Sequence, residues 1–109
     1  MQAAPSPVGR LQQLQKMLEA SPDDTFLLYG IGMEYKKAGD SQRAVEHFNR
    51  VLQIDPGYCY AYYQRGQTEE TVGDEESARR SYREGIDAAA KKGDAHARSE
   101  LEAALDLLG

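Results

Sequence analysis

The sequence repeats itself at a spacing of 34 residues, and this period restricts the fold more than any single motif does. Residues of the same kind recur at this spacing in both directions along the chain. The pairs are Gly32 and Gly66, Gly39 and Gly73, Asp40 and Asp74, Ala44 and Ala78, Phe48 and Tyr82, Pro22 and Pro56, Leu14 and Phe48, and Met17 and Val51. A fixed period of this length predicts a stack of similar units, each of which buries its apolar face against its neighbours.

The segment 28–56 is the clearest unit, and it predicts two helices that fold back on each other. Its first half carries an apolar stripe at helical spacing, formed by Leu28, Ile31 and Tyr35. Gly39 is suited to end that helix in the left-handed conformation, and Asp40 is suited to cap the next one. The second helix has its own apolar stripe, which consists of Ala44, Phe48, Val51 and Leu52.

Gly32 lies inside the first of these helices, where glycine costs about 1 kcal/mol relative to alanine. The simplest physical explanation is that the second helix approaches the backbone closely at this point. The recurrence of the residue as Gly66 indicates that the contact is repeated in the next unit.

The rest of the chain extends the same pattern into a single domain over residues 6–109, after a disordered segment over residues 1–5. The first helix carries a stripe of Val8, Leu11, Leu14, Met17 and Leu18, and the last carries one of Leu101, Ala104, Leu105 and Leu108. Ser21 is expected to cap the second helix, in an approximate capping box with Asp24. The expected helices cover about 7–20, 22–38, 41–54, 57–72, 75–92 and 95–108.

The period and several residues at fixed offsets within it resemble the tetratricopeptide repeat family. The residues that carry the resemblance are Leu28, Ile31, Gly32, Tyr35, Ala44, Phe48, Val51 and Pro56. The resemblance implies an all-α, right-handed solenoid of antiparallel helix hairpins, with two full repeats, an N-terminal half repeat and a C-terminal capping helix.

The second repeat departs from the family pattern at Arg65 and Glu69, where the family usually has apolar or aromatic residues. These two residues lie one helical turn apart. This spacing allows them to pair with each other, which requires good geometry if they are buried.

The composition bounds the class of partner and the compartment. The formal net charge is -5 and the pI is about 5.0, which argues against binding to nucleic acid or to an anionic membrane. Cys59 is the one cysteine, so the chain has no intramolecular disulfide. With no transmembrane segment and no secretory signal in the sequence, we expect a cytoplasmic protein.

The sequence contains no catalytic, cofactor-binding or metal-binding motif, so we expect no enzyme activity and no cofactor. His47 is expected to be a solvated surface residue, and Cys59 a partly buried one without a neighbouring base. His96 and Glu100 are i, i+4 partners, which are too few ligands for a structural zinc site.

A second stripe on the 22–38 helix lies beside the core stripe, about 100° around the helix. The resemblance implies that the first helix of each repeat lines a concave surface, where this stripe and its counterpart would form a shallow groove. Phe26, Tyr29, Met33, Lys36 and Lys37 make the stripe, and Tyr60, Tyr63, Gln67 and Glu70 make its counterpart. The alternative is that the first or the last helix covers these residues as ordinary core.

We expect the chain to be a protein-interaction module that binds a peptide or helix of a partner protein in this aromatic groove. The alternative is a structural role in which the module self-associates as a homo-oligomer. Family members that grip a C-terminal carboxylate use Lys and Asn on this face, and here Tyr29 and Met33 stand at comparable positions. The resemblance therefore argues against that subclass.

Overall fold

Residues 7–109, the part of the chain that the computed structural model describes, form six α-helices. The expected disorder of residues 1–5 lies outside this range. The helices are α1 (Pro7–Ala20), α2 (Thr25–Lys37), α3 (Ser41–Ile54), α4 (Cys59–Thr71), α5 (Glu75–Lys92) and α6 (Ala95–Leu108). The predicted all-α class is therefore confirmed.

The predicted helix boundaries hold where glycine and aspartate stand together. Gly39, Gly73 and Gly93 have φ values of +83°, +83° and +74°, the left-handed region that glycine enters without a steric cost. The aspartate after each one caps the following helix: the Asp40 side chain accepts from the backbone N–H of Arg43 at 3.1 Å. Asp74 and Asp94 make the same contact at the starts of α5 and α6.

Two helices begin later than the sequence pattern predicted. Helix α2 was expected from residue 22 and begins at Thr25, because Pro22 and Asp23 form a turn first. Asp24, rather than Ser21, is the cap, and its side chain accepts from the Leu27 N–H at 3.2 Å. Helix α4 was expected from residue 57 and begins at Cys59, after a turn in which Asp55 accepts from the Gly57 N–H at 3.0 Å.

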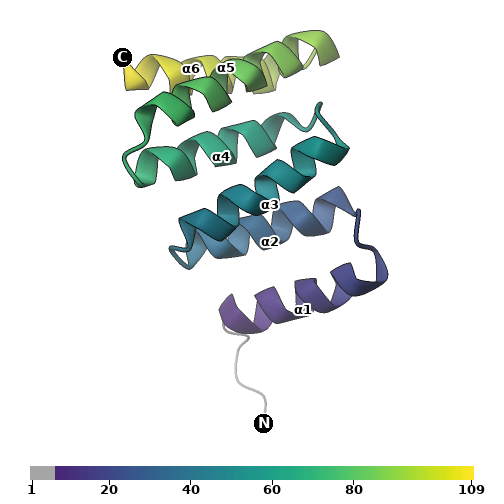
Figure 1. Ribbon diagram of the computed structural model, residues 1–109. Helices are drawn as coiled ribbons and strands as arrows, with labels where there is room; N and C mark the ends of the chain where they lie inside the picture. Colours follow the sequence, from purple (N-terminus) through teal and green to yellow (C-terminus); the bar gives the residue numbers. More distant parts are fainter. Residues whose placement is uncertain (1–6) are drawn as a thin grey trace.

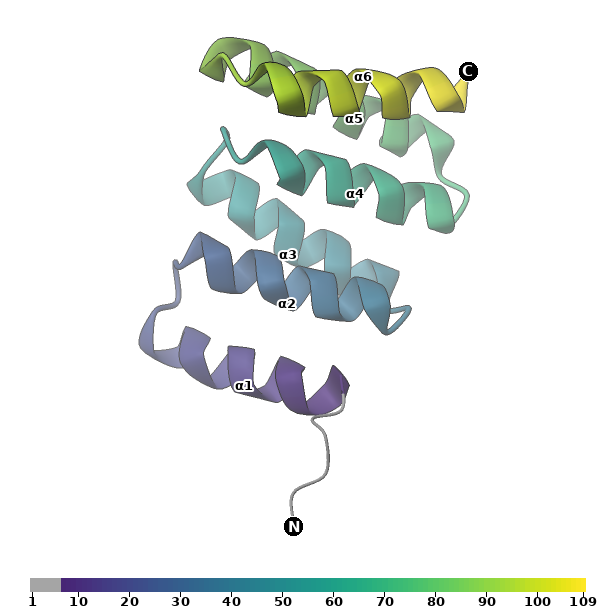
Figure 2. The ribbon, with the colours of Figure 1, turned by 180° about the vertical axis from the view of Figure 1, so that it is seen from behind.

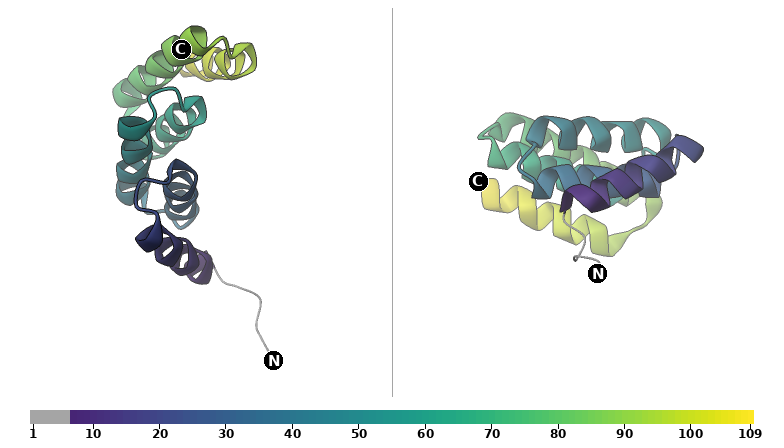
Figure 3. Two further views of the ribbon diagram at one scale, coloured as in Figure 1. Left: turned by 90° about the vertical axis from the view of Figure 1, so that its right-hand side faces the viewer. Right: turned by 90° about the horizontal axis from the view of Figure 1, so that it is seen from below.

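The helices stack in chain order into a curved solenoid with two rows (Figure 1). Helices α2, α4 and α6 form one row and run in the same direction, with α3 and α5 behind them (Figure 2). The stack bends so that the row of α2, α4 and α6 lies on the concave side (Figure 3). We call the surface of α2, α4 and α6 on this side the inner face and the surface of α3 and α5 the outer face. Each described helix packs mainly on the helices before and after it, as expected for a repeat fold.

The repeated glycines bring the two helices of each hairpin into contact through an aromatic ring. A Cβ added at Gly32 would lie 2.6 Å from Cε1 of Phe48, a residue of α3 that is fully buried. A Cβ added at Gly66 would collide with the ring of Tyr82, which occupies the same place in the second repeat. The predicted close approach at Gly32 and its recurrence at Gly66 are confirmed.

The core is divided between the two repeats. One buried cluster contains Leu28, Val51, Leu52 and Ala61, and the other contains Cys59, Ala78, Tyr82, Ala89, Ala97 and Leu101. Leu18 of α1 packs on the first cluster, whereas Met17, expected on the same stripe, is 56% exposed. The side chain of Val8 lies outside the described part of the structure. Ala104, Leu105 and Leu108 of α6 pack on the second cluster, as predicted for a capping helix.

Substitution of Gly32 by alanine is expected to destabilise the protein by up to about 2 kcal/mol. The gain in helix propensity is about 1 kcal/mol, but overpacking against the Phe48 ring costs about 1–3 kcal/mol. Gly30→Ala is the matched control, because a Cβ at Gly30 meets Leu14 at an ordinary 3.5 Å. That variant should gain about 0.5–1 kcal/mol. Urea unfolding followed by circular dichroism measures both, and equal effects of the two substitutions would contradict the close approach.

Candidate functional site

The nine residues predicted to line the partner-binding stripe belong to α2 and α4, two helices of the inner row, and none of them is fully buried. Phe26 is 75% exposed. Lys37 and Glu70 are also exposed, and the other six are partly buried: Tyr29, Met33, Lys36, Tyr60, Tyr63 and Gln67. The first and last helices therefore do not bury these residues completely.

The tyrosines of the inner face also contribute to packing. Tyr29 stacks on Tyr58 with ring centroids 5.1 Å apart and contacts Phe48 at 5.8 Å. Tyr63 lies 6.2 Å from Tyr82, and Tyr60 and Tyr63 both pack on the second core cluster. Burial raises the pKa of the Tyr29 hydroxyl. These rings are thus held in place by the core while one side remains open, as is typical of aromatic contact surfaces.

Lys36 joins α2 to α4 through two glutamine side chains. Its Nζ donates to Oε1 of Gln64 at 2.6 Å and to Oε1 of Gln67 at 2.7 Å. Gln67 in turn donates from Nε2 to the hydroxyl of Tyr63 at 3.2 Å. Burial lowers the pKa of the Lys36 ammonium, because the charged form loses solvation.

The other charged residues of the predicted stripe already have partners within the chain. Lys37 lies 3.4 Å from Oε2 of Glu34, a buried carboxylate that Arg10 of α1 also approaches at 3.6 Å. Glu70 accepts a hydrogen bond from the hydroxyl of Tyr82. These two side chains are therefore less free to meet a ligand than the sequence suggested.

Two residues of the inner face were not predicted. Gln64 contributes an acceptor for Lys36, and Tyr58 stacks on Tyr29. Their counterparts 34 residues earlier are Gly30 and Asp24, which carry no aromatic or amide group. The first repeat therefore has no aromatic or amide side chain at these two positions to indicate them. The sequence of the second repeat alone would have indicated both.

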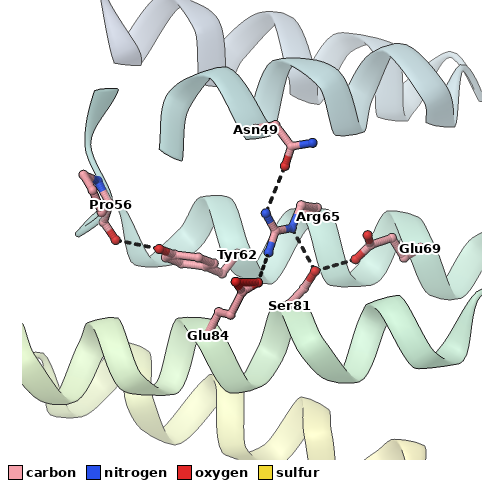
Figure 4. A network of polar contacts seen from close by, with 7 residues as sticks. All are labelled: Asn49, Pro56, Tyr62, Arg65, Glu69, Ser81 and Glu84. Atoms are coloured by element: carbon pink, nitrogen blue, oxygen red, sulfur yellow. Dashed lines mark hydrogen bonds and ion pairs between the residues drawn. The ribbon is translucent and has the colours of Figure 1, made fainter. Parts of the chain in front are cut away.

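Arg65 forms the centre of a polar network on the outer face, between α3 and α5 (Figure 4). Its guanidinium donates to Glu84 at 2.6 Å, to Ser81 at 2.8 Å and to Asn49 at 2.9 Å. It also lies 5.5 Å from the centroid of the Tyr62 ring, a cation–π distance. The side chain is only 14% exposed, so these contacts satisfy a largely buried charge.

The direct pair that the spacing of Arg65 and Glu69 allows is absent from the described residues. Arg65 forms its ion pair with Glu84 of α5, and Glu69 accepts instead from the hydroxyl of Ser81. Ser81 therefore bridges the two residues, as Figure 4 shows. Burial raises the pKa of the Glu69 carboxyl, and the Ser81 hydrogen bond and the Arg65 charge oppose that shift.

The outer face carries hollows that the sequence did not predict. One of about 580 Å³ is bounded by the loop 55–57, Tyr62 and the second half of α5. A smaller one of about 260 Å³ lies over the Arg65 network. Both have carboxylates and cations mixed along their walls, with Glu84 shared between them. Neither therefore presents a surface of one charge.

The cysteine and the two histidines, for which the sequence predicted no catalytic or metal-binding role, contact other groups of the chain. Cys59 is 4% exposed, its Sγ faces the Gly57 carbonyl at 3.4 Å, and burial raises the pKa of the thiol. His47 contacts the Tyr35 ring at 5.2 Å and the Arg43 carbonyl at 2.8 Å. His96 and Glu100 lie 2.6 Å apart at an exposed position. Within residues 7–109 no group of three or more potential metal ligands occurs.

No helix among the described residues combines the length and the apolar character needed to cross a membrane.

Comparison with known proteins identifies the family to which this helical repeat is similar. Models of the tetratricopeptide repeat match residues 26–58 and 60–92. The TPR repeat-containing protein PA0015 of Pseudomonas aeruginosa is 35% identical over 91 residues, which cover 84% of this chain and 87% of that protein.

Solved structures agree with the family models. Protein BPP2914 from Bordetella parapertussis superposes with a TM-score of 0.79 at 30% identity, covering 99% of this chain and 89% of that one. A tetratricopeptide repeat domain protein from Salinibacter ruber gives a TM-score of 0.71 at 29% identity, covering 78% of this chain and 94% of that one.

The substitution Arg65→Leu is expected to destabilise the protein by about 1–3 kcal/mol, because buried Ser81 loses its donor and the partly buried Glu69 carboxylate loses a nearby positive charge. The triple variant Arg65→Leu, Glu69→Leu, Ser81→Ala removes the polar groups together. Its free energy of unfolding should lie within about 1 kcal/mol of that of the unchanged chain, because replacing a whole buried network by apolar groups costs little. Urea unfolding measures this coupling. A triple variant as unstable as the sum of its single changes would contradict it.

Proposed function

This chain belongs to the tetratricopeptide repeat family, and on that basis we propose that it binds a peptide or helix of a partner protein on its inner face, without catalysis. Repeats of this family mediate protein–protein interactions. The observation that supports the inner face as the contact surface is its set of exposed and partly exposed aromatic side chains on α2 and α4, two helices that run in the same direction.

The rigidity of these side chains favours binding. Tyr29, Tyr60 and Tyr63 are fixed by the core on one side, so a ligand that covers them pays little side-chain entropy. Phe26 extends the surface at the first turn of α2 with a ring that is 75% exposed. Exposed aromatic groups of this kind are typical of the residues that dominate binding energy.

Replacing Phe26 and Tyr60 by alanine is expected to weaken peptide binding by about tenfold or more, because it removes the exposed aromatic contacts. Peptides would be selected from a random display library on the immobilised chain, and their dissociation constants measured by fluorescence anisotropy. The control is Met17→Ala with Val72→Ala, which removes two other exposed apolar side chains, 56% and 62% exposed. Circular dichroism checks that all variants remain helical.

The proposal fails if no peptide is enriched on the immobilised chain. It fails equally if the control pair weakens binding as much as the Phe26 and Tyr60 pair does.

A second candidate function is self-association through the ends of the solenoid. The observation in its favour is that large apolar side chains are exposed on both end helices, with Met17 of α1 56% exposed and Leu107 of α6 89% exposed. Apolar groups at the two ends of a repeat stack can pack on a second copy.

Self-association predicts that the mass measured by light scattering rises with concentration, and that Leu107→Glu or Met17→Glu returns it to the monomer value. A mass that stays at 12.1 kDa over the whole concentration series would remove this candidate and leave the peptide-binding function unaffected.

A further inference from the structure

Lys36 has a charge that its own fold does not neutralise. Its two acceptors, the side-chain oxygens of Gln64 and Gln67, are neutral amides. No carboxylate of residues 7–109 forms an ion pair with Nζ, whereas neighbouring Lys37 is paired with Glu34. An ammonium has three hydrogens to donate, so one remains available.

The Lys36 ammonium has lost part of its solvation, which destabilises its charged form. Lys36 is partly buried, and burial lowers the pKa of its ammonium with no nearby negative charge to oppose the shift. A partly desolvated cation without a counter-ion is stabilised by an anion that approaches it.

The groups around Lys36 are already oriented for such an anion. Gln67 directs its oxygen to Lys36 and its Nε2 to the Tyr63 hydroxyl. Gln64 directs its oxygen to Lys36 from the same helix. Within the described residues the Tyr63 hydroxyl donates to no acceptor, so it retains a hydrogen for a ligand. The network thus presents an ammonium and a hydroxyl group on the two sides of the Gln67 amide.

We propose that Lys36, held by Gln64 and Gln67, binds the side-chain carboxylate of an aspartate or glutamate in the segment that docks on the inner face. The inference rests on the proposed function and adds the chemistry of one position in the partner. A carboxylate accepts hydrogen bonds and neutralises the ammonium, and such charge-assisted bonds are stronger than those between neutral groups.

The charges at the other end of the inner face fix where the acidic residue goes. Tyr60 lies near the start of α4, where burial and, to a smaller extent, the negative charges of Glu100 and Asp94 raise the pKa of its hydroxyl. Lys36 lies near the end of α2, which runs in the same direction as α4. An acidic partner residue is therefore attracted to the Lys36 end and repelled from the Tyr60 end.

The single unpaired ammonium favours one acidic residue in the partner segment over a run of acidic residues. At the C-terminal ends of α2 and α4, the neighbouring cation Lys37 is already bound to Glu34, and Glu70 adds a negative charge. One carboxylate matches one unpaired cation, whereas a run of acidic residues would meet Glu70.

The test uses pairs of capped peptides that bind the inner face and differ only in one Glu or Gln. The glutamate member is expected to bind the unchanged chain about tenfold more tightly than its glutamine twin. With Lys36→Gln the two members should bind within about twofold of each other, and Lys36→Arg should retain the preference for glutamate. Lys37→Gln is the matched control, since it removes the adjacent charge and should leave the preference unchanged.

The outcomes separate this inference from the proposed function. If peptides bind in a manner that depends on Phe26 and Tyr60 but show no preference for glutamate, the carboxylate site is wrong and the function stands. If no peptide binds, both are overturned. If a peptide without acidic side chains gains the same advantage from a free C-terminus, the site recognises a terminal carboxylate and the proposal for an acidic side chain is wrong.

Discussion

The contact between a helical glycine and a buried aromatic ring determines the geometry of each hairpin. Gly32 receives Phe48, and Gly66 receives Tyr82, so the backbones of α2 and α3, and of α4 and α5, approach more closely than any side chain would permit. Because both rings are fully buried, the same residues that set the spacing also form the largest parts of the core. The rows of helices and the curved inner face follow from two copies of one contact.

The sequence predicted the features that depend on local chemistry. The helix ends before Gly39, Gly73 and Gly93 were correct, as was the cap at Asp40, because left-handed glycine and capping aspartate act within a few residues. The late starts of α2 and α4 were missed, because proline is compatible both with a turn and with the first turn of a helix. The partner of Arg65 was missed for a different reason: Glu84 is distant in sequence, and only the packing of α5 on α4 brings it near.

The inner face was predicted in outline and not in detail. Helical spacing identified its aromatic residues, but spacing does not reveal which polar side chains the fold has already paired. Lys36 and Lys37 are adjacent in sequence and look equivalent. Lys36 nevertheless donates to two neutral amides of α4, whereas Lys37 pairs with a buried carboxylate. The difference arises from a rotation of about 100° between neighbouring positions on a helix.

Helix α4 lacks the aspartate N-cap that begins α2, α3, α5 and α6. Tyr58 occupies this position in α4, and its side chain makes no capping hydrogen bond to the helix. Its sequence is also rich in tyrosine and threonine, and it contains Gly66, so its intrinsic helix preference is low. This central helix therefore derives its stability from its neighbours on both sides. The two repeats are consequently coupled into one unit of unfolding, and local opening of the chain begins at its ends rather than between them.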